Sequence, residues 1–467
     1  MSADDLCFVP AHVLRGRIAS KELSSVDLIE AVIARAERVD EQLNFIALPR
    51  FEQAREAAAA AEAALARGDS LGPLHGIPIT IKDNIPTAGD VTTVGSYAFE
   101  HNVAQDDAEM AKRLKAAGAI VYAKTTTPEF AHRVLTESPL HGVTRSPWSP
   151  EYTPGGSSGG ASVAVAAGCG PLAQGTDGGG SIRCPASCTG IVGIKPTLGR
   201  IPFELMQDGF GNYAFTGPMA RSVDDAALML AVMSGPLGAD PWTLAVPALP
   251  PPDTPVRGSV AGLRVAWIER FGAVPLDPEV AAATGDAVAA LSDAGARVEA
   301  VVEPALADVF EYYPVIATAA HGGRLSGLLE KWGERITPSM RACIEQGGTY
   351  SAAQLVQASD RRTALFRRIQ SLFEEHDLIL TPTLNAPPKT VDENGAINST
   401  MYSEWAVYLY PFNLTGHPAA SVPVGFTRAG LPVGLQLVGP WYSEPRLLET
   451  MAWLEANRPW AARRPPV

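Results

Sequence analysis

The feature that most constrains this chain is an amphipathic helix that ends at a glycine and leads into a short apolar strand. This order occurs in "AEMAKRLKAAGAIVYAKT" (108–125) and again in "DPEVAAATGDAVAALSDAGARVEAVV" (277–302), where Asp277 fits an N-cap and Pro278 the first helical position. Further strand candidates are "GIPITIKD", "LRVAWIE", "LILTP", "ASVPVGF" and "VGLQLVG". Alternating helices and strands predict an α/β fold, a layered mixed β-sheet with helices on both faces.

The flanking segments are expected to belong to the same unit, so residues 1–467 are predicted to form a single domain. Residues 1–68 are expected to be helical, because Ser24 and Asp27 fit a capping box and Gly68 ends an alanine-rich helix. The segment "PALPPPDTPVRG" (247–258) has five prolines and is expected to be an extended surface connection. Strand candidates lie on both sides of it, so it is not expected to separate two domains.

Composition narrows the class of protein. The 467 residues are 46% hydrophobic, enough for a large core, and the formal net charge of −13 disfavours a nucleic-acid partner. The N-terminus does not resemble a signal peptide, and no apolar stretch is long enough for a transmembrane helix, so no membrane partner is expected. The five cysteines are an odd number without a complete zinc motif, which favours a reducing, cytoplasmic location and buried thiols.

The stretch "TPGGSSGGASVA" (153–164) raises the first question about chemistry. Ser157 fits the G-x-S-x-G pattern of a nucleophile elbow, in which a strand leads directly into the serine. Pro147, Pro150 and Pro154 precede it instead, and proline cannot donate to a sheet ladder. His321, His376 and His417 are available as bases but have no supporting motif. The pattern therefore disfavours Ser157 as an elbow nucleophile.

A second serine lies 24 residues further on, in "QGTDGGGSIRCPAS" (174–187). Three consecutive glycines, Gly178, Gly179 and Gly180, precede Ser181 and allow several backbone N–H groups to point at one place. Such a nest can stabilise an oxyanion beside a nucleophile. A plain glycine-rich turn or a phosphate cradle is the alternative, although no complete phosphate-binding motif is present.

A serine nucleophile needs a base, and Lys82 is the candidate. It ends the apolar strand of "GIPITIKD", where burial would lower its pKa and make it neutral. Taken alone, a lysine at a strand end is more often solvated. The serine–glycine stretches favour the buried alternative.

These stretches, in this order, resemble the amidase signature family. The resemblance rests on "GPLHGIPITIKDN", "AIVYAKTTTPEFA", "TPGGSSGGASVAVAAG", "GTDGGGSIRCPASCTGIVGIKPTLGRIP", "GPMARSVDD" and "FNLTGHPAASVPVGF" with "GLPVGLQLVG", and it spans about 72–440. It implies the amidase signature fold, with residues 72–220 as signature core and 305–375 as a variable, mostly helical substrate region.

The resemblance also implies roles for individual residues. Ser181 matches the nucleophile, Lys82 the base, and Ser157 a bridging serine that follows a cis peptide bond at Gly156. The backbone N–H groups of Gly178, Gly179, Gly180 and Ser181 match the oxyanion hole. Ser158, Asp177 and Arg183 match family positions that surround and support the triad. The family needs neither a metal nor an organic cofactor.

The resemblance predicts a hydrolase of small-molecule amides that acts as a monomer or homodimer. Hydrolysis of carbamates by the same triad is one alternative, and the glutaminase subunit of a tRNA-dependent amidotransferase is another. "AKTTTPEFA" resembles the stand-alone amidases more than it resembles the glutaminase subunit. The intact triad disfavours a non-catalytic binding protein on the same fold.

Aromatic and apolar side chains are locally enriched after the signature core, in a chain that is only 7% aromatic. Core packing and an apolar substrate pocket are equally compatible with this enrichment. No arginine or lysine is evident that would hold a substrate carboxylate, so a neutral, hydrophobic or aromatic amide such as an anilide is predicted. The enriched residues are Phe203, Leu205, Met206, Phe210, Tyr213 and Phe215; Phe310, Tyr312 and Tyr313; and Tyr402, Trp405, Tyr408, Tyr410 and Phe412.

Overall fold

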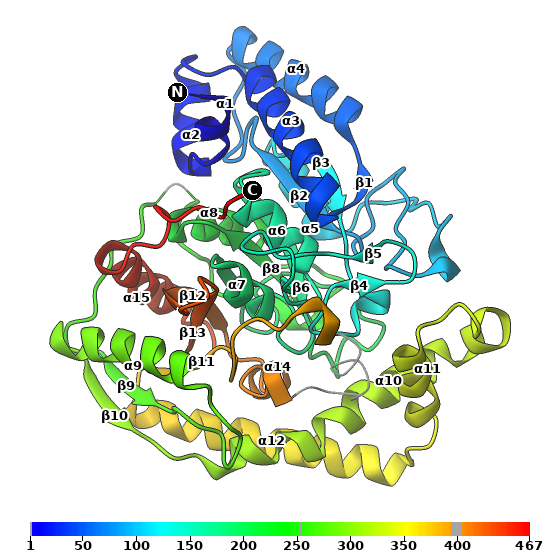
Figure 1. The fold of residues 1–467 in the computed structure, drawn as a ribbon, viewed down its shortest axis with the longest axis vertical. Helices are drawn as coiled ribbons and strands as arrows, with labels where there is room; N and C mark the ends of the chain where they lie inside the picture. Colours follow the sequence, from blue (N-terminus) through cyan, green and yellow to red (C-terminus); the bar gives the residue numbers. More distant parts are fainter. Residues whose placement is uncertain (1, 253, 394–403) are drawn as a thin grey trace.

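A single mixed β-sheet runs through the molecule and is covered by helices (Figure 1). The computed structural model describes the whole chain except residues 1, 253 and 394–403. The eleven strands of the sheet follow the order β1-β3-β2-β6-β8-β7-β12-β13-β11-β9-β10. The α/β fold predicted from the alternation of elements is confirmed.

The strands of this sheet are short, as is usual for a large α/β core. They are β1 (Ile46–Pro49), β2 (Pro78–Lys82), β3 (Ile120–Thr125), β6 (Leu172–Asp177), β7 (Val192–Lys195), β8 (Phe215–Ala220), β9 (Arg264–Trp267), β10 (Arg297–Ala300), β11 (Leu378–Pro382), β12 (Ala419–Phe426) and β13 (Pro432–Val438). A separate hairpin pairs β4 (Glu137–Ser138) with β5 (Gly142–Val143).

The helices surround the sheet in both halves of the chain. They are α1 (Ala3–Cys7), α2 (Ala11–Ala19), α3 (Ser25–Leu43), α4 (Phe51–Arg67), α5 (Glu109–Ala116), α6 (Gly159–Ala166), α7 (Arg183–Thr189), α8 (Val223–Met233), α9 (Pro278–Asp293), α10 (Tyr313–Trp332), α11 (Pro338–Gly347), α12 (Ala352–Glu375), α14 (Tyr410–Leu414) and α15 (Glu444–Asn457). Short 3₁₀ helices include η2 (Glu129–Ala131) and η4 (Pro304–Glu311).

Both helix–glycine–strand units form as predicted. Gly118 (φ 88°) lies between α5 and β3, and Gly295 (φ 96°) lies between α9 and β10. A positive φ costs glycine little, so the chain can turn from helix to strand at these positions. The Asp277 side chain accepts hydrogen bonds from the N–H groups of Glu279 and Val280, which makes it the N-cap of α9.

The N-terminal region departs from the sequence prediction in one element. Within residues 2–68 the elements are helices joined by short turns, except for β1, which pairs antiparallel with β3 at the edge of the sheet. Asn44 ends α3 in the left-handed conformation, and Asp40 Oδ1 accepts from the N–H groups of Phe45 and Ile46. These contacts turn the chain onto the sheet edge. The sequence analysis missed β1 because a strand of four residues between two helices is too short to show the alternation of apolar and polar residues.

The structure places the two other segments that the sequence analysis singled out. The described residues of 247–258 contain no helix or strand, as expected of a connection. Residues 305–375 fold mainly as α10, α11 and α12, which lie together at one side of the molecule (Figure 1). Residues of the N-terminal helices and of the distal strands share one apolar cluster, from Leu14 through Ile79 to Leu380. The single-domain organisation itself stays a prediction.

Truncation of Leu380 tests that prediction. Leu380 is fully buried in β11, where it pairs with Leu437 of β13 and Trp267 of β9. Leu380→Ala should destabilise the protein by about 2–5 kcal/mol through lost burial and a cavity. It should lower the melting temperature of the whole chain in one transition, monitored by circular dichroism and tryptophan fluorescence. Leu355→Ala is the control, since Leu355 is exposed on α12. Two separated transitions would contradict a single domain.

Candidate functional site

The predicted site residues gather where two neighbouring parallel strands end. β2 ends at Lys82 and β6 at Asp177, and Ile81 is paired with Gln174, so both carboxyl ends open on the same edge of the sheet. Two loops close over this edge: the serine–glycine loop before α6 and the triple-glycine loop before α7. Ser158 N donates to Ser181 O at 3.1 Å and joins the two loops.

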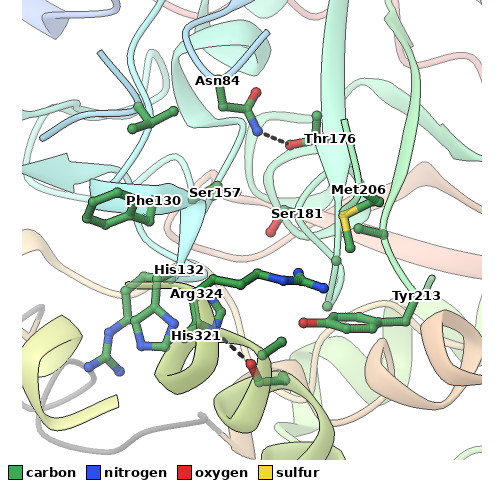
Figure 2. Close-up of a pocket in the computed structure, with 18 of the residues that line it drawn as sticks. Asn84, Phe130, His132, Ser157, Thr176, Ser181, Met206, Tyr213, His321 and Arg324 are labelled. Atoms are coloured by element: carbon green, nitrogen blue, oxygen red, sulfur yellow. Dashed lines mark hydrogen bonds between the residues drawn. The ribbon is translucent and has the colours of Figure 1, made fainter. Parts of the chain in front are cut away.

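A cavity of about 500 Å³ opens at this edge, and Ser157 and Ser181 both line it (Figure 2). The cavity also reaches the loop after β3 and the helix α10. Its other lining residues include Asn84, Val94, Phe99, Phe130, His132, Thr176, Gly178, Gly179, Phe203, Leu205, Met206, Tyr213, Tyr313, His321, Arg324, Leu325, Leu328 and Tyr410.

Lys82 is fully buried among hydroxyl groups rather than solvated at the strand end. Its Nζ lies 2.6 Å from Ser157 Oγ, 3.0 Å from Ser158 Oγ and 3.0 Å from Thr176 Oγ1. Burial lowers the pKa of Lys82 well below its usual value, and the more distant charge of Asp177 offsets this only in part. Lys82 is therefore placed as a neutral amine.

The surrounding hydrogen bonds decide what that neutral amine can do. The hydroxyl of Ser158 donates to Thr176 O at 3.1 Å, so it can only accept from Lys82. Thr176 Oγ1 accepts from Asn84 Nδ2 at 3.0 Å as well as from Lys82. Two N–H groups of the amine are thereby used. Its lone pair is left for the hydroxyl proton of Ser157.

The serine–glycine loop holds Ser157 against Lys82. The peptide bond between Gly156 and Ser157 is cis, as the family resemblance implied. A Cβ on Gly156 would lie 2.4 Å from Leu135 O, so only glycine allows the loop to approach that backbone so closely. Thr136 Oγ1 donates to Gly155 O and accepts from Gly159 N, which fixes the loop from both sides.

The triple-glycine loop is fixed by a buried ion pair. Arg183 Nη2 lies 3.0 Å from Asp177 Oδ1, and both side chains are 0% exposed. Burial alone would raise the pKa of Asp177, but Arg183 and a hydrogen bond from Asn413 hold it well below its usual range. Arg183 also donates to Asn413 Oδ1 and to Gln436 Oε1, both at 2.6 Å. Its remaining donors are thus satisfied within the core.

One expected oxyanion donor is corrected by this arrangement. The N–H of Gly180 donates to Asp177 Oδ1 at 2.6 Å, because the φ of 102° at Gly180 turns its backbone toward that carboxylate. Gly180 therefore helps to shape the loop. Gly178, Gly179 and Ser181, which carry the other expected donor amides, line the cavity.

The aromatic clusters divide between the cavity and the core. Phe203, Leu205, Met206, Tyr213, Tyr313 and Tyr410 line the cavity. Tyr313 and Tyr410 stack at 4.6 Å, and the Tyr313 hydroxyl donates to Gly178 O at 2.9 Å. Most other members pack elsewhere: Phe215, Tyr312, Trp405, Tyr408 and Phe412 are buried, and Phe310 packs against Tyr410. Phe210 is 80% exposed, and Tyr402 lies outside the described residues.

Sequence reasoning also missed polar residues of the cavity. It identified no basic side chain for a substrate carboxylate, whereas the guanidinium of Arg324 on α10 extends over the cavity (Figure 2). Asn84 and Thr176 were missed although both lie within recognised stretches, at the end of "GPLHGIPITIKDN" and near the start of "GTDGGGSIRCPAS". An arginine on a helix 143 positions after Ser181 gives no sequence signal, because only the packing of α10 brings it here.

The three histidines considered for a Ser–His triad have other surroundings. His376 is bound by Leu372 O and Glu299, and His417 contacts Thr415 and Gln370. His321 does line the cavity, beside His132. Burial lowers the pKa of both of these imidazoles, so they are neutral.

Comparison with known proteins shows the family. The Amidase family model matches residues 27–448. The chain is 34% identical over 473 residues to an acylamidase of Rhodococcus erythropolis, with 100% of this chain and 98% of the relative covered. It is 36% identical over 492 residues to one subunit of the glutamyl-tRNA(Gln) amidotransferase of Moorella thermoacetica, with 99% of each covered. A bacterial aryl acylamidase structure superposes with a TM-score of 0.90 at 28% identity, covering 97% of each chain.

The chain therefore belongs to the amidase signature family. It is a hydrolase that cleaves the carbon–nitrogen bond of amides, with a small-molecule amide as its substrate. All five cysteines are buried thiols, as the sequence predicted. Within the described residues, every helix is too short or too polar to cross a membrane.

Proposed function

We propose that Ser181 is the nucleophile of this amidase, Lys82 its base and Ser157 the relay between them. The observation that carries the proposal is the buried, neutral Lys82 at 2.6 Å from Ser157 Oγ, with Ser157 and Ser181 on the wall of one cavity. Ser157 is thus assigned to proton transfer, which agrees with the prolines that precede it where an elbow would have a strand.

The chemistry divides into two steps. Lys82 accepts the Ser157 proton while Ser157 accepts the proton of Ser181, whose oxygen attacks the carbonyl carbon. The protonated relay then delivers a proton to the departing nitrogen, so the carbon–nitrogen bond breaks and an acyl-enzyme remains. Water repeats the sequence in the second step and releases the acid. Each proton that Lys82 accepts is returned to the departing group, and none of these steps calls on a metal or an organic cofactor.

Charge stabilisation is assigned to the triple-glycine loop. The amides of Gly178, Gly179 and Ser181 would donate to the oxyanion that forms during each step. The buried Asp177–Arg183 pair fixes the loop before the substrate binds, so little reorganisation is required. Ser158 is a positioning residue, since its hydroxyl orients Lys82 and accepts the N–H of Thr176.

The substrate that fits this cavity best is an aromatic or otherwise hydrophobic amide. The stacked Tyr313 and Tyr410, together with Phe130 and Leu325, give the cavity a largely apolar wall. Relatives named acylamidase and aryl acylamidase support this choice. Arg324 is exposed at the cavity, where solvent screens its charge, so we expect it to orient a polar substrate end without requiring a carboxylate.

Two alternatives keep the same triad. A carbamate carbonyl undergoes the same attack and forms the same oxyanion. Glutamine hydrolysis within an amidotransferase is the other alternative, favoured by the 36% identity to the Moorella thermoacetica protein. We favour the stand-alone enzyme, a monomer or homodimer, because "AKTTTPEFA" resembles the stand-alone amidases more than it resembles the glutaminase subunit. The buried thiols favour a reducing location such as the cytoplasm.

Replacing each triad member tests the assignment. Ser181→Ala, Lys82→Ala and Ser157→Ala should each lower kcat by on the order of 10³-fold or more, and their combination should lower it little further, because the three act as a unit. Steady-state rates and mass spectrometry of the trapped acyl-enzyme measure this. Ser162→Ala is the control, since its hydroxyl bonds only Gly159 O within α6. An acyl-enzyme that persists in Ser181→Ala but not in Ser157→Ala would reverse the two serines.

The lowered pKa of Lys82 predicts the pH profile. The base works only when deprotonated, so kcat/KM should rise with pH through this lowered pKa and level off at neutral to alkaline pH. Lys82→Arg should have no such plateau, since arginine stays protonated. Lys112→Arg is the control, because Lys112 is exposed on α5, and it should keep the wild-type profile. An acidic optimum with activity falling above neutral would exclude a lysine base.

Substrate preference is tested by comparing kcat/KM for a nitroanilide, an aryl carbamate, a small aliphatic amide and glutamine. The nitroanilide should be preferred, because its ring replaces water on the apolar wall. A carboxylate on the nitroanilide should raise kcat/KM little, because the charge of Arg324 is screened. For the same reason, Arg324→Gln should change kcat/KM for the neutral nitroanilide by less than about threefold. A preference for glutamine would support the amidotransferase alternative, and a preference for the small amide would contradict the apolar wall.

A further inference from the structure

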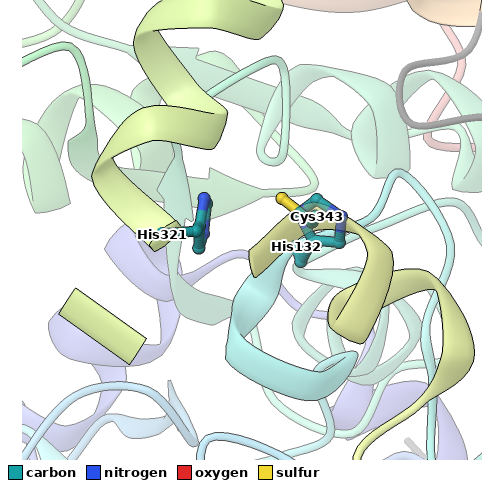
Figure 3. A group of neighbouring side chains, drawn as sticks. All are labelled: His132, His321 and Cys343. Carbon is teal, nitrogen blue, oxygen red and sulfur yellow. The ribbon is translucent and has the colours of Figure 1, made fainter. Parts of the chain in front are cut away.

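A group of three side chains outside the triad lies at the same cavity, and two of the three line its wall. His132, His321 and Cys343 come from three separate segments and converge on one point (Figure 3). One nitrogen of each imidazole and the Sγ of the cysteine all lie within 4.8 Å of one another. The two imidazole rings are 5.2 Å apart, edge to face. The proposed hydrolytic mechanism uses none of these groups.

The packing that brings them together is rigid. α10 and α11 touch backbone to backbone, since a Cβ on Gly322 would lie 2.4 Å from Gly347 C and only glycine fits there. This contact places His321 beside Cys343. The segment of His132 is tied to the start of α11, because Glu129 Oε2 accepts from both Thr337 N and Thr337 Oγ1 at 2.8 Å.

The tautomer of His321 suits metal ligation. Its Nδ1 lies 2.7 Å from Ala317 O, and a carbonyl oxygen can only accept, so Nδ1 carries the hydrogen. Nε2 therefore carries the lone pair. A metal-bound histidine usually has this arrangement, in which its other ring nitrogen donates to a backbone carbonyl.

We propose that His132, His321 and Cys343 bind Zn²⁺, and that zinc at this position inhibits the amidase. Two imidazoles and a thiolate form a donor set that zinc prefers over hard cations. Tetrahedral zinc, with bonds of about 2.0 Å to nitrogen and about 2.3 Å to sulfur, separates its ligand atoms by roughly 3.5 Å. The side chains would have to rotate to bring atoms that lie up to 4.8 Å apart to this spacing. Binding replaces the thiol proton of Cys343, which passes to solvent.

The inhibition follows from where the three groups lie. His132 and His321 line the cavity, whereas Cys343 lies buried behind them. The fourth zinc position therefore faces the cavity and would hold water or an anion there. That ligand would take up substrate space, and the metal would join α10 to the segment of His132. The inhibitory part rests on the proposed function of this cavity, whereas zinc binding does not.

Zinc binding is measured directly on the full-length, metal-free protein. With Zn²⁺ alone as the probe, calorimetry and elemental analysis should give one ion per chain, and Co²⁺ should give a thiolate charge-transfer band. Cys343→Ser and His321→Gln should each weaken zinc binding by about tenfold or more. The controls Cys7→Ser and His101→Gln replace a buried thiol and an exposed imidazole elsewhere, and should bind as wild type. Equal binding by wild type and both cluster variants would overturn the site.

Inhibition is measured on the same proteins as the loss of kcat/KM on addition of zinc, each relative to its own metal-free rate. Wild type and the two controls should be inhibited and recover with chelator, whereas Cys343→Ser and His321→Gln should resist. Zinc bound at this site without inhibition would overturn the inhibitory role. Ser181→Ala should bind zinc as wild type does. If that variant also kept its hydrolytic activity, the proposed nucleophile would fail while the zinc site would stand.

Discussion

The buried ion pair between Asp177 and Arg183 is the interaction on which the site depends. Two unscreened charges in a core are tolerated only when each is paired and the remaining donors and acceptors are bonded. Here Asn413 and Gln436 satisfy Arg183, while the amides of Gly180 and Ile182 satisfy Asp177. The pair therefore joins the end of β6, the start of α7 and the C-terminal strands. The triple-glycine loop is fixed between them.

The same low-dielectric surroundings give Lys82 its chemistry. An ammonium group there would lose its hydration, so the neutral amine is favoured and its lone pair becomes available. The distribution of hydrogen bonds then directs that lone pair: Ser158 and Thr176 accept from the amine, and Ser157 remains to give a proton. In the proposed mechanism, burial thus creates the base, and the neighbouring hydroxyl groups direct its lone pair toward Ser157.

One side of the cavity is formed by strand ends and glycine loops, and the other side is formed by α10. Strand ends and glycine loops hold Ser157 and Ser181, whereas α10 supplies Tyr313, His321 and Arg324. Catalysis and substrate choice are therefore assigned to different parts of the chain. The proposed zinc site lies where α10 and α11 meet the loop after β3, so a cation there would act on the substrate side of the cavity and leave the triad unchanged.

The sequence by itself determined the local elements and indicated the proposed reacting groups. Helix–glycine–strand units fold as their periodicity predicts, because side-chain burial and glycine conformation are local properties. The glycines of the serine–glycine stretches are required by close backbone approach, whereas the roles of Lys82 and the two serines came from the resemblance to the family. β1 was missed because a segment of four residues is too short to show the alternation of a strand.

Only the tertiary structure decided which distant groups share the cavity. Arg324 and His321 lie on α10, whose sequence gives no sign of the site, and His132 follows a recognised stretch without a pattern that marks it as a lining residue. It also decided that the Gly180 amide serves Asp177, and which aromatic residues face the cavity rather than the core. Such choices depend on the direction of a hydrogen bond or the side of a helix. Contacts between segments far apart in the chain set both, so no local pattern of residues encodes them.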